Sequence, residues 1–179
     1  MFKIGQGIDV HAFAAERKLI IGGVEIPHEK GLAGHSDADV LIHAVCDAIL
    51  GAAGLGDIGL HFPDSDEKYH NIDSKILLQE VIAKIHKEKF EVVNIDCTII
   101  AQSPKLSPYI NSMREILSAI LDINKNNLNI KATTTENLGF TGRKEGIEAH
   151  AICLLQSTTC PENDAARGKN ACPAHARED

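Results

Sequence analysis

The distribution of apolar residues predicts that the chain opens with strands. Residues 2–10 form the first apolar run and are typical of a strand, in which successive side chains point to opposite faces. Two short apolar segments, 18–21 and 24–26, flank Gly22-Gly23, a pair that readily adopts the positive φ angles of a two-residue hairpin turn. We therefore expect a strand followed by a β-hairpin.

Apolar residues at helical spacing predict a first helix after the hairpin. Asp37 or Asp39 is suited to cap its N-terminus, and Gly54 and Gly56 are expected to end it after about Ala53. Its apolar stripe comprises Leu41, Ala44, Val45, Ala48 and Ile49. This stripe is expected to face the core.

The rest of the chain alternates between helical and extended patterns. The expected elements are a helix over 73–88, a strand over 92–101, a helix over 108–121, a strand over 128–135 and a final apolar run over 148–155. There is no internal repeat. This order of elements indicates an α+β or α/β domain with two layers.

Composition narrows the class of protein. At 179 residues the chain is expected to form one soluble domain, and no apolar run approaches the ~20 residues that span a bilayer. A net charge of −7 argues against a nucleic-acid partner, whereas a small anionic substrate is compatible with it if metal ions mask the repulsion. The N-terminal residues lack a secretory or transit pattern, so we expect a cytoplasmic location.

The five cysteines include no C-x-x-C pair. Cys46, Cys97 and Cys153 lie inside apolar runs and are expected to be buried thiols, which suits a reducing compartment. Residues 157–179 are polar, rich in Ala, Pro and charge, and without periodicity, so we predict a disordered tail. The potential metal ligands of that tail, Cys160, Cys172 and His175, are interpreted as incidental.

Three side chains near the N-terminus are suited to bind a metal ion. In a strand, Asp9 and His11 share one face, and His43 of the first helix is the best candidate for a third ligand. An oxygen and two nitrogens favour zinc, with manganese or iron as alternatives. Asp39 and Asp47 share the helix face of His43, and one or the other is suited to orient its ring. The alternative is a solvated helix face with a lone histidine.

His35-Ser36 precedes the first helix, where unpaired backbone N–H groups attract anions, so His35 is suited to contact a phosphate. The simpler interpretation is helix capping by Ser36 or Asp37, and both can hold together. Two acidic loop segments, 57–59 and 62–66, either line a site or cap helices, and the residues do not separate these alternatives. Residues 101–106 leave a predicted buried strand through a proline and offer backbone groups and one cation.

A run of hydroxyl groups ends the strand near residue 133. Thr133-Thr134-Thr135 can donate hydrogen bonds to phosphate oxygens, and Glu136 can hold a hard cation such as magnesium. The alternative is a β-branched strand in which Glu136 partners a helix cap. The loop 139–143 that follows ends in Arg143, which is suited either to bidentate phosphate binding or to simple surface exposure.

Seven blocks of sequence stand out together. They are DVHAF at 9–13, IGG at 21–23, HSDAD at 35–39, LGDIG at 55–59, FPD at 62–64, AQSPK at 101–105 and TTTENLGFTGR at 133–143. In this order they closely resemble the 2-C-methyl-D-erythritol 2,4-cyclodiphosphate synthase family. The resemblance covers about residues 2–156, and the last block is specific enough to carry it alone.

The resemblance implies an α+β, ferredoxin-like two-layer subunit, with a mixed sheet packed against helices, over residues 1–156. It also implies a homotrimer with active sites between neighbouring subunits. Because each site needs two subunits, a monomer should be inactive. An apolar cavity on the threefold axis, faced by Arg143, is expected to accept an isoprenoid diphosphate.

The implied activity is that of a phosphorus–oxygen lyase in non-mevalonate isoprenoid biosynthesis. The 2-phosphate of 4-diphosphocytidyl-2-C-methyl-D-erythritol 2-phosphate attacks the β-phosphate of the same molecule, which gives the 2,4-cyclodiphosphate and CMP. By resemblance, Zn²⁺ is held by Asp9, His11 and His43, and Mg²⁺ or Mn²⁺ by Glu136. The positions of His35 and Thr134 stabilise the transition state.

The family's substrate-binding positions carry over to a larger set of residues. They are Asp9, His11, His35, Ser36, Asp57, Ile58, Gly59, Phe62, Pro63, Asp64, Ser65, Asp66, Ala101, Gln102, Ser103, Pro104, Lys105, Leu106, Thr133, Thr134, Thr135, Glu136, Phe140 and Arg143. Residues 62–66 are expected around the methylerythritol end and 101–106 around cytosine. One position departs from the family, because His70 stands where a lysine is common, so a phosphate contact is lost or passes to Lys68. His70 is therefore left out of the predicted site.

Two other classes of function fit part of the pattern. A zinc-dependent phosphohydrolase would use similar ligands, but it needs an activated water, and no further general base is evident beside Asp9 and His11. A non-catalytic trimer that binds nucleotides or isoprenoids would keep the fold without turnover. The intact set of four metal ligands argues against it.

Overall fold

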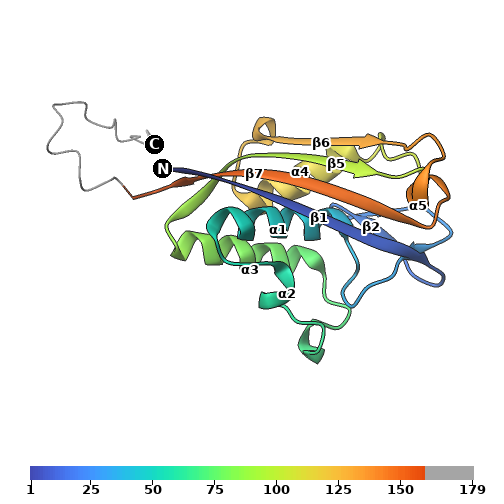
Figure 1. Ribbon diagram of the computed structural model, residues 1–179, viewed down its shortest axis with the longest axis horizontal. Helices are drawn as coiled ribbons and strands as arrows, with labels where there is room; N and C mark the ends of the chain where they lie inside the picture. The colour runs from blue at the N-terminus through green and yellow to red at the C-terminus, as the bar shows by residue number, and fades with distance from the viewer. Residues whose placement is uncertain (160–179) are drawn as a thin grey trace, which may run out of the picture.

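Five strands form one mixed sheet, and the helices cover one of its faces (Figure 1). The computed structural model describes residues 1–159. The strand order is β4-β1-β7-β5-β6, where β5 and β6 are parallel and the other neighbours are antiparallel. The sheet strands are β1 (Phe2–Ala14), β4 (Gly31–Leu32), β5 (Phe90–Ile100), β6 (Leu128–Thr133) and β7 (Gly146–Ser157). The protein is therefore an α+β fold with two layers.

The remaining elements connect and cover these strands. The hairpin consists of β2 (Leu19–Ile21) and β3 (Val24–Ile26). The longer helices are α1 (Val40–Ala53), α3 (Ser74–Lys87) and α4 (Ile110–Leu121). Shorter helical turns are α2 (Ile58–His61), α5 (Gly139–Gly142), η1 (Glu67–Tyr69) and η2 (Lys125–Asn127).

The close contact between α1 and β1 depends on two glycines. Gly5 and Gly7 lie on the helix-facing side of β1, and a Cβ atom at either would overlap the backbone of α1, at Ala48 and Ala44 respectively. The same strand face continues to Asp9 and His11 because side chains alternate with a period of two. The first turn of α1 thus lies directly beside Asp9 and His11.

The opposite face of the sheet is not covered by any element of residues 1–159. Its exposed apolar side chains include Ile4, Ile8, Val10 and Ile152, with exposed fractions of 72%, 49%, 48% and 45%. Patches of this kind usually mark an interaction surface.

The sequence predicted the long elements correctly. Asp39 caps α1, Gly54 ends it in the left-handed conformation, and Gly22 and Gly23 form the hairpin turn with positive φ. The strand predicted over 2–10 extends to Ala14, because its last residues pair with β4 and β7. The two-residue β4 and the single-turn helices α2 and α5 were not predicted.

Three further expectations concern the cysteines, the tail and the membrane. Cys46, Cys97 and Cys153 are free and buried as expected, and burial raises the pKa of Cys97 and of Cys153 to about 12. Of the predicted tail, Ser157 pairs with Phe90 at the end of β7, while 160–179, with Cys160, Cys172 and His175, lie outside the described residues. In the described part of the chain, no helix has the length and apolar character needed to cross a membrane.

Candidate active site

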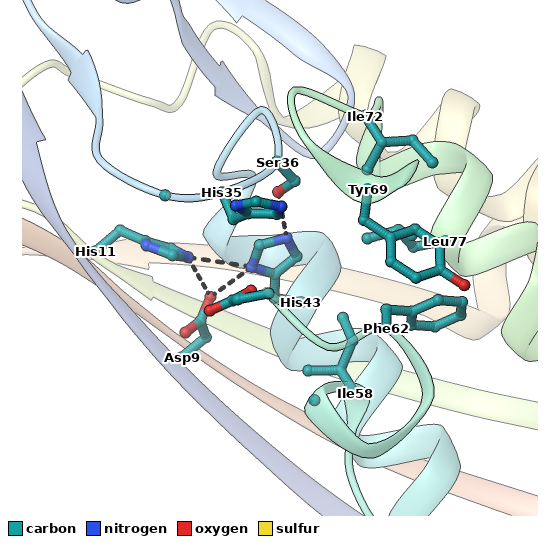
Figure 2. A pocket seen from close by; sticks show the side chains of 13 residues that line it. Asp9, His11, His35, Ser36, His43, Ile58, Phe62, Tyr69, Ile72 and Leu77 are labelled. Atoms are coloured by element: carbon teal, nitrogen blue, oxygen red, sulfur yellow. Dashed lines mark hydrogen bonds and ion pairs between the residues drawn. The ribbon is translucent and has the colours of Figure 1, made fainter. Parts of the chain in front are cut away.

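The three predicted metal ligands meet in one triangle (Figure 2). Oδ2 of Asp9 lies 2.9 Å from Nε2 of His11 and 3.0 Å from Nδ1 of His43, and the two nitrogens are 3.1 Å apart. Asp9 and His11 come from β1, and His43 comes from the first turn of α1. All three side chains are partly buried, so the site is accessible from one side.

The triangle fits a zinc ion. Ligand atoms about 2.0–2.1 Å from a tetrahedral zinc lie roughly 3.3 Å from one another, close to the observed separations. The Asp9 oxygen carries no proton, so hydrogen bonds within the triangle depend on the N–H groups of the two histidines. Two such groups cannot fill all three sides of the triangle. A cation at its centre would accept a lone pair from each of the three atoms. Three protein ligands would leave the fourth position free for a substrate oxygen.

The triangle also shifts the charge state of its members. Burial disfavours the ionised carboxylate of Asp9, but hydrogen bonds and charge from His11 and His43 outweigh burial and hold its pKa well below the usual range. Burial likewise disfavours a charged His11, but its hydrogen bond to Asp9, the charge of that carboxylate and smaller contributions from Ala33 and Asp39 together outweigh burial and raise the pKa of the imidazole. Without a metal, the ligand set therefore attracts a proton in place of the cation.

The partners that orient His43 differ from those expected. Asp39 and Asp47 were expected to hold its ring, but this expectation is wrong: Nε2 of His43 lies 3.0 Å from Oγ of Ser74 and 3.1 Å from Oγ of Ser36. Asp47 instead accepts a hydrogen bond from the backbone of Ile58, at 2.7 Å, and so fixes the start of α2.

Asp39 has a structural role. Its fully buried carboxylate accepts hydrogen bonds from the backbone N–H groups of Gly22, Gly23 and Ile42. Burial raises its pKa to about 6, although the hydrogen bonds from Gly23, Ile42 and Gly22 oppose the shift. This side chain ties the hairpin turn to the N-terminus of α1, and thereby helps to place His43.

His35 lies beside the triangle with one free ring atom. Its Nε2 is buried and has no hydrogen-bond partner within the described residues. The loop that carries it is held from outside: Arg17 donates to the carbonyl oxygens of Gly34, at 2.8 Å, and Ser36, at 2.5 Å. The N–H of Asn71 donates to the carbonyl oxygen of His35 at 2.7 Å. His35 is thus fixed through its backbone while its ring stays available.

A pocket of about 250 Å³ adjoins these residues. It is lined by Asp9, His11, Gly34, His35, Ser36, His43, Ile58, Gly59, Phe62, Asp64, Tyr69, Ile72 and Leu77. Its volume is below the usual range of roughly 300–1,000 Å³ for small-molecule sites, so it suits one part of a larger substrate.

The acidic loops of residues 57–66 contribute to this pocket only in part. Asp57 caps α2 through the N–H of Leu60, and Asp66 caps η1 through the N–H of Lys68. The pocket lining does not include Asp57, Pro63, Ser65 or Asp66. Both predicted alternatives, site lining and helix capping, therefore apply to different residues of these loops.

A second pocket of about 520 Å³ lies at the ends of β5 and β6. It is lined by Ala101, Gln102, Pro104, Lys105, Leu106, Ser107, Ala132, Thr133 and Thr134. This set contains the residues predicted to surround cytosine except Ser103, and it contains Ser107, which was not predicted. The two pockets share no lining residue.

The hydroxyl run continues from the second pocket into an exposed loop. Thr134 donates to Oε1 of Glu136 at 2.5 Å, and Thr135 donates to the carbonyl oxygen of Leu138 at 2.6 Å. Glu136 is an exposed carboxylate, which suits magnesium because that ion often takes one carboxylate together with substrate phosphates. Phe140 lies on α5 beyond this loop. Arg143 is exposed and paired with Glu145 at 2.8 Å.

Several residues beside the site were missed by sequence reasoning. Ser74 follows Asp73 at a helix start and looks like capping, and Arg17 lies in a charged loop without any motif. His70, left out of the predicted site, packs edge to face against His35 with 5.0 Å between ring centroids. Tyr69, Ile72 and Leu77 also line the first pocket, but the spacing of apolar residues does not distinguish them from ordinary core residues.

Comparisons with known proteins agree with this geometry. Residues 2–156 match the YgbB family. The 2-C-methyl-D-erythritol 2,4-cyclodiphosphate synthase of Bacillus cereus strain B4264 is 59% identical over 156 residues, which cover 87% of this chain and 99% of that protein.

Two solved structures share the fold. The bifunctional IspDF of Campylobacter jejuni superimposes with a TM-score of 0.85 at 46% identity, covering 88% of this chain and 42% of that longer chain. The IspF protein of Plasmodium falciparum, in complex with CDP, superimposes with a TM-score of 0.77 at 35% identity, covering 88% of this chain and 97% of that one.

Proposed function

This chain belongs to the YgbB family, which includes the 2-C-methyl-D-erythritol 2,4-cyclodiphosphate synthases. We propose that its two pockets together bind the substrate of these synthases and perform the cyclisation. The chain is a lyase of isoprenoid biosynthesis that cyclises 4-diphosphocytidyl-2-C-methyl-D-erythritol 2-phosphate. The observation that carries the mechanism is the triangle of Asp9, His11 and His43 beside the free Nε2 of His35. We assign the activity to residues 1–156.

The reaction joins two phosphates of one molecule. An oxygen of the 2-phosphate forms a bond to the β-phosphorus, and the bond from that phosphorus to the oxygen of the α-phosphate breaks. The leaving oxygen keeps the electron pair and departs as CMP, so no water is consumed. Since nucleophile and electrophile are tethered, most of the task is to fold the substrate and hold its ends together.

Cations are required because the approaching groups are both negative. Asp9, His11 and His43 would hold zinc, and the exposed carboxylate of Glu136 would hold magnesium or manganese. When bound, these ions screen the phosphate charges and polarise the diphosphate as Lewis acids. The ligand residues themselves would keep the ions at fixed points on a rigid strand and helix.

His35 and Thr134 supply hydrogen bonds to the phosphates. The backbone of His35 is anchored on both sides by Arg17, so its ring can donate from Nε2 without rearrangement of the loop. Thr134 offers a hydroxyl at the edge of the second pocket. Both hydrogen bonds would become stronger as negative charge accumulates on the oxygens of the β-phosphate under attack.

The two pockets suit different ends of the substrate. The pocket beside the triangle, with Ile58, Phe62 and Asp64, would hold the methylerythritol end, and the pocket at residues 101–106 would hold cytidine. A family structure in complex with CDP supports a cytidine-diphosphate site in this fold. His70 packs against His35, with 5.0 Å between the ring centroids, so it would stand next to a phosphate that His35 contacts.

A homotrimer would bring a cytidine pocket of one subunit to the triangle of its neighbour. The exposed face of Ile4, Ile8, Val10 and Ile152 supports burial against further copies of the chain, and the separation of the two pockets within one chain supports shared sites. Under this proposal an axial cavity near Arg143 would accept an isoprenoid diphosphate.

The subunit would belong to the ferredoxin-like class of α+β folds. The two-layer architecture supports the ferredoxin-like class at a coarse level, although β5 and β6 are parallel. We keep the cytoplasm as the proposed location.

Phosphorus NMR of the products tests the reaction. Purified protein with zinc and magnesium should convert the substrate to the cyclic diphosphate and equimolar CMP. Inorganic phosphate as the product would instead identify a phosphohydrolase, and an unchanged substrate would identify a non-catalytic binding protein.

A further inference from the structure

The side of His43 that faces away from the triangle contacts two serines, and one of them, Ser74, contacts an aspartate. We call Ser36, Asp37 and Ser74 the serine–aspartate cluster. Nε2 of His43 lies 3.0 Å from Oγ of Ser74, and that hydroxyl lies 2.5 Å from Oδ1 of Asp37. Ser36 is 6% exposed and Ser74 is fully buried, so these contacts are shielded from water.

The direction of these hydrogen bonds follows from the available protons. Asp37 as a carboxylate can only accept, so the single hydroxyl proton of Ser74 is donated to it. Ser74 then presents a lone pair to His43, so a proton on Nε2 fills this contact. Any proton that Nδ1 donates to Asp9 in the metal-free protein is the one that the cation displaces. Ser36 does not oppose this assignment, because its oxygen accepts from the N–H of Ala38 and its own proton can point to Ser74, 3.4 Å away.

We propose that Asp37 and Ser74 are positioning residues that hold the proton of His43 on Nε2 and so reserve Nδ1 for the cation. This inference rests on the proposed zinc site. The second nitrogen of a metal-bound histidine commonly donates to such a partner, which fixes both the tautomer and the ring plane. Here the partner is a serine whose direction is set by a carboxylate.

Helix capping does not account for the whole cluster. Oδ2 of Asp37 accepts from the backbone N–H of Ser74, which is an ordinary contact at a helix start. The cap of α3, however, is already provided by Asp73, whose side chain accepts from the N–H of Lys75. The contact from the Ser74 hydroxyl to Oδ1 is additional, and it is the one that reaches His43.

The experiment compares zinc affinity in three variants. Asp37→Asn keeps the shape but introduces an amide that can donate to Ser74, which frees the serine proton to point at His43. Ser74→Ala removes the acceptor for Nε2. Asp73→Asn alters the neighbouring acid, which also lies at the start of α3 but whose side chain is directed to Lys75. Zinc dissociation constants are measured by competition with a chromophoric chelator, and urea midpoints are measured on the same samples.

We expect Asp37→Asn and Ser74→Ala to raise the zinc dissociation constant about 10- to 100-fold, while Asp73→Asn stays near the wild-type value. Nitrogen-15 NMR of metal-free protein should show a proton on Nε2 of His43 in the wild type and its partial loss in Asp37→Asn. Wild-type zinc affinity in both cluster variants, or an unprotonated Nε2 in the wild type, would overturn the inference while leaving the zinc site intact. A wild-type protein without zinc affinity would overturn the site itself and the inference with it.

Discussion

Arg17 is the residue whose importance is least visible in the sequence. It holds the carbonyl oxygens on both sides of His35, so its removal should loosen the loop without touching any ligand of the triangle. We expect Arg17→Ala to lower kcat/KM by about 10- to 100-fold, since small misplacements of a phosphate donor are costly. Zinc content should stay unchanged.

Lys18→Ala provides the matched control for this prediction. Lys18 is the next residue, but its ammonium group forms an exposed pair with Glu25. Activity in this variant should equal that of the wild type. Equal activity of Arg17→Ala and the wild type in steady-state assays would show that the loop of His35 does not need the hydrogen bonds from Arg17.

The titration of His11 predicts how zinc binding depends on pH. Burial lowers the pKa of His11, but the hydrogen bond to Asp9 and the charge of that carboxylate, with smaller contributions, together outweigh burial, so the pKa of the metal-free imidazole lies above its ordinary 6.5. Below that raised value a proton occupies the ring, and zinc must displace it. The zinc dissociation constant should therefore increase by up to about tenfold for each pH unit of acidification and level off at higher pH.

Chelator competition between pH 5.5 and 8.5 measures this dependence. Asp9→Asn removes the charge that raises the pKa of His11, so in this variant the dependence should move to lower pH while overall affinity falls. Affinity that does not change with pH in the wild-type protein would exclude His11 as a ligand.

The sequence was sufficient to predict that the three side chains of the triangle come together, but insufficient to predict which residues hold them in place. Asp9, His11 and His43 were predictable because alternation on a strand and a nearby helix start limit where these side chains can point. Asp39 was misjudged, since sharing a helix face with His43 does not prevent its carboxylate from turning to the hairpin. Ser74 was hidden because it lies 31 positions from His43 and its role depends on tertiary packing.

The contact between β1 and α1 is the element-scale feature on which the site depends. A Cβ atom on Gly7 would overlap the carbonyl oxygen of Ala44, so α1 would have to move away from the strand and carry His43 with it. We expect Gly7→Ala to reduce the free energy of unfolding by about 1–3 kcal/mol and to weaken zinc binding.

Gly51→Ala is the control within the same pair of elements. Its added Cβ atom would lie 4.0 Å from the nearest neighbour, so it should be neutral or stabilise α1 by roughly 0.5–1 kcal/mol. Urea unfolding compares the two variants. Wild-type stability in Gly7→Ala would mean that α1 and β1 are not held at the spacing that the triangle requires.

Long elements were predictable and short ones were not, for a physical reason. The helix ending at Ala53 has caps and an apolar stripe, which are local signals. The two-residue strand β4 exists only because it pairs with the end of β1, and α2 is a single turn fixed by Asp47 and Asp57. Neither has enough residues to produce a periodic pattern.

For the molecule as a whole, the proposed trimer makes a quantitative prediction about mixed subunits. His43→Ala damages the triangle and Thr134→Ala damages the edge of the second pocket, so each variant alone should be nearly inactive. If each site combines pockets from two subunits, coexpressed variants in equal amounts should regain up to about one quarter of wild-type activity. Complete inactivity of the mixed protein would place both pockets of a site in one subunit.

The origin of the attacking oxygen distinguishes cyclisation from hydrolysis. In the cyclisation, the 2-phosphate of the substrate attacks its own diphosphate and water takes no part. When the reaction runs in water enriched in oxygen-18, mass spectrometry should find no heavy oxygen in either CMP or the cyclic diphosphate. Heavy oxygen in either phosphorus-containing product would contradict the account, because it would show that the site activates water as a hydrolase does.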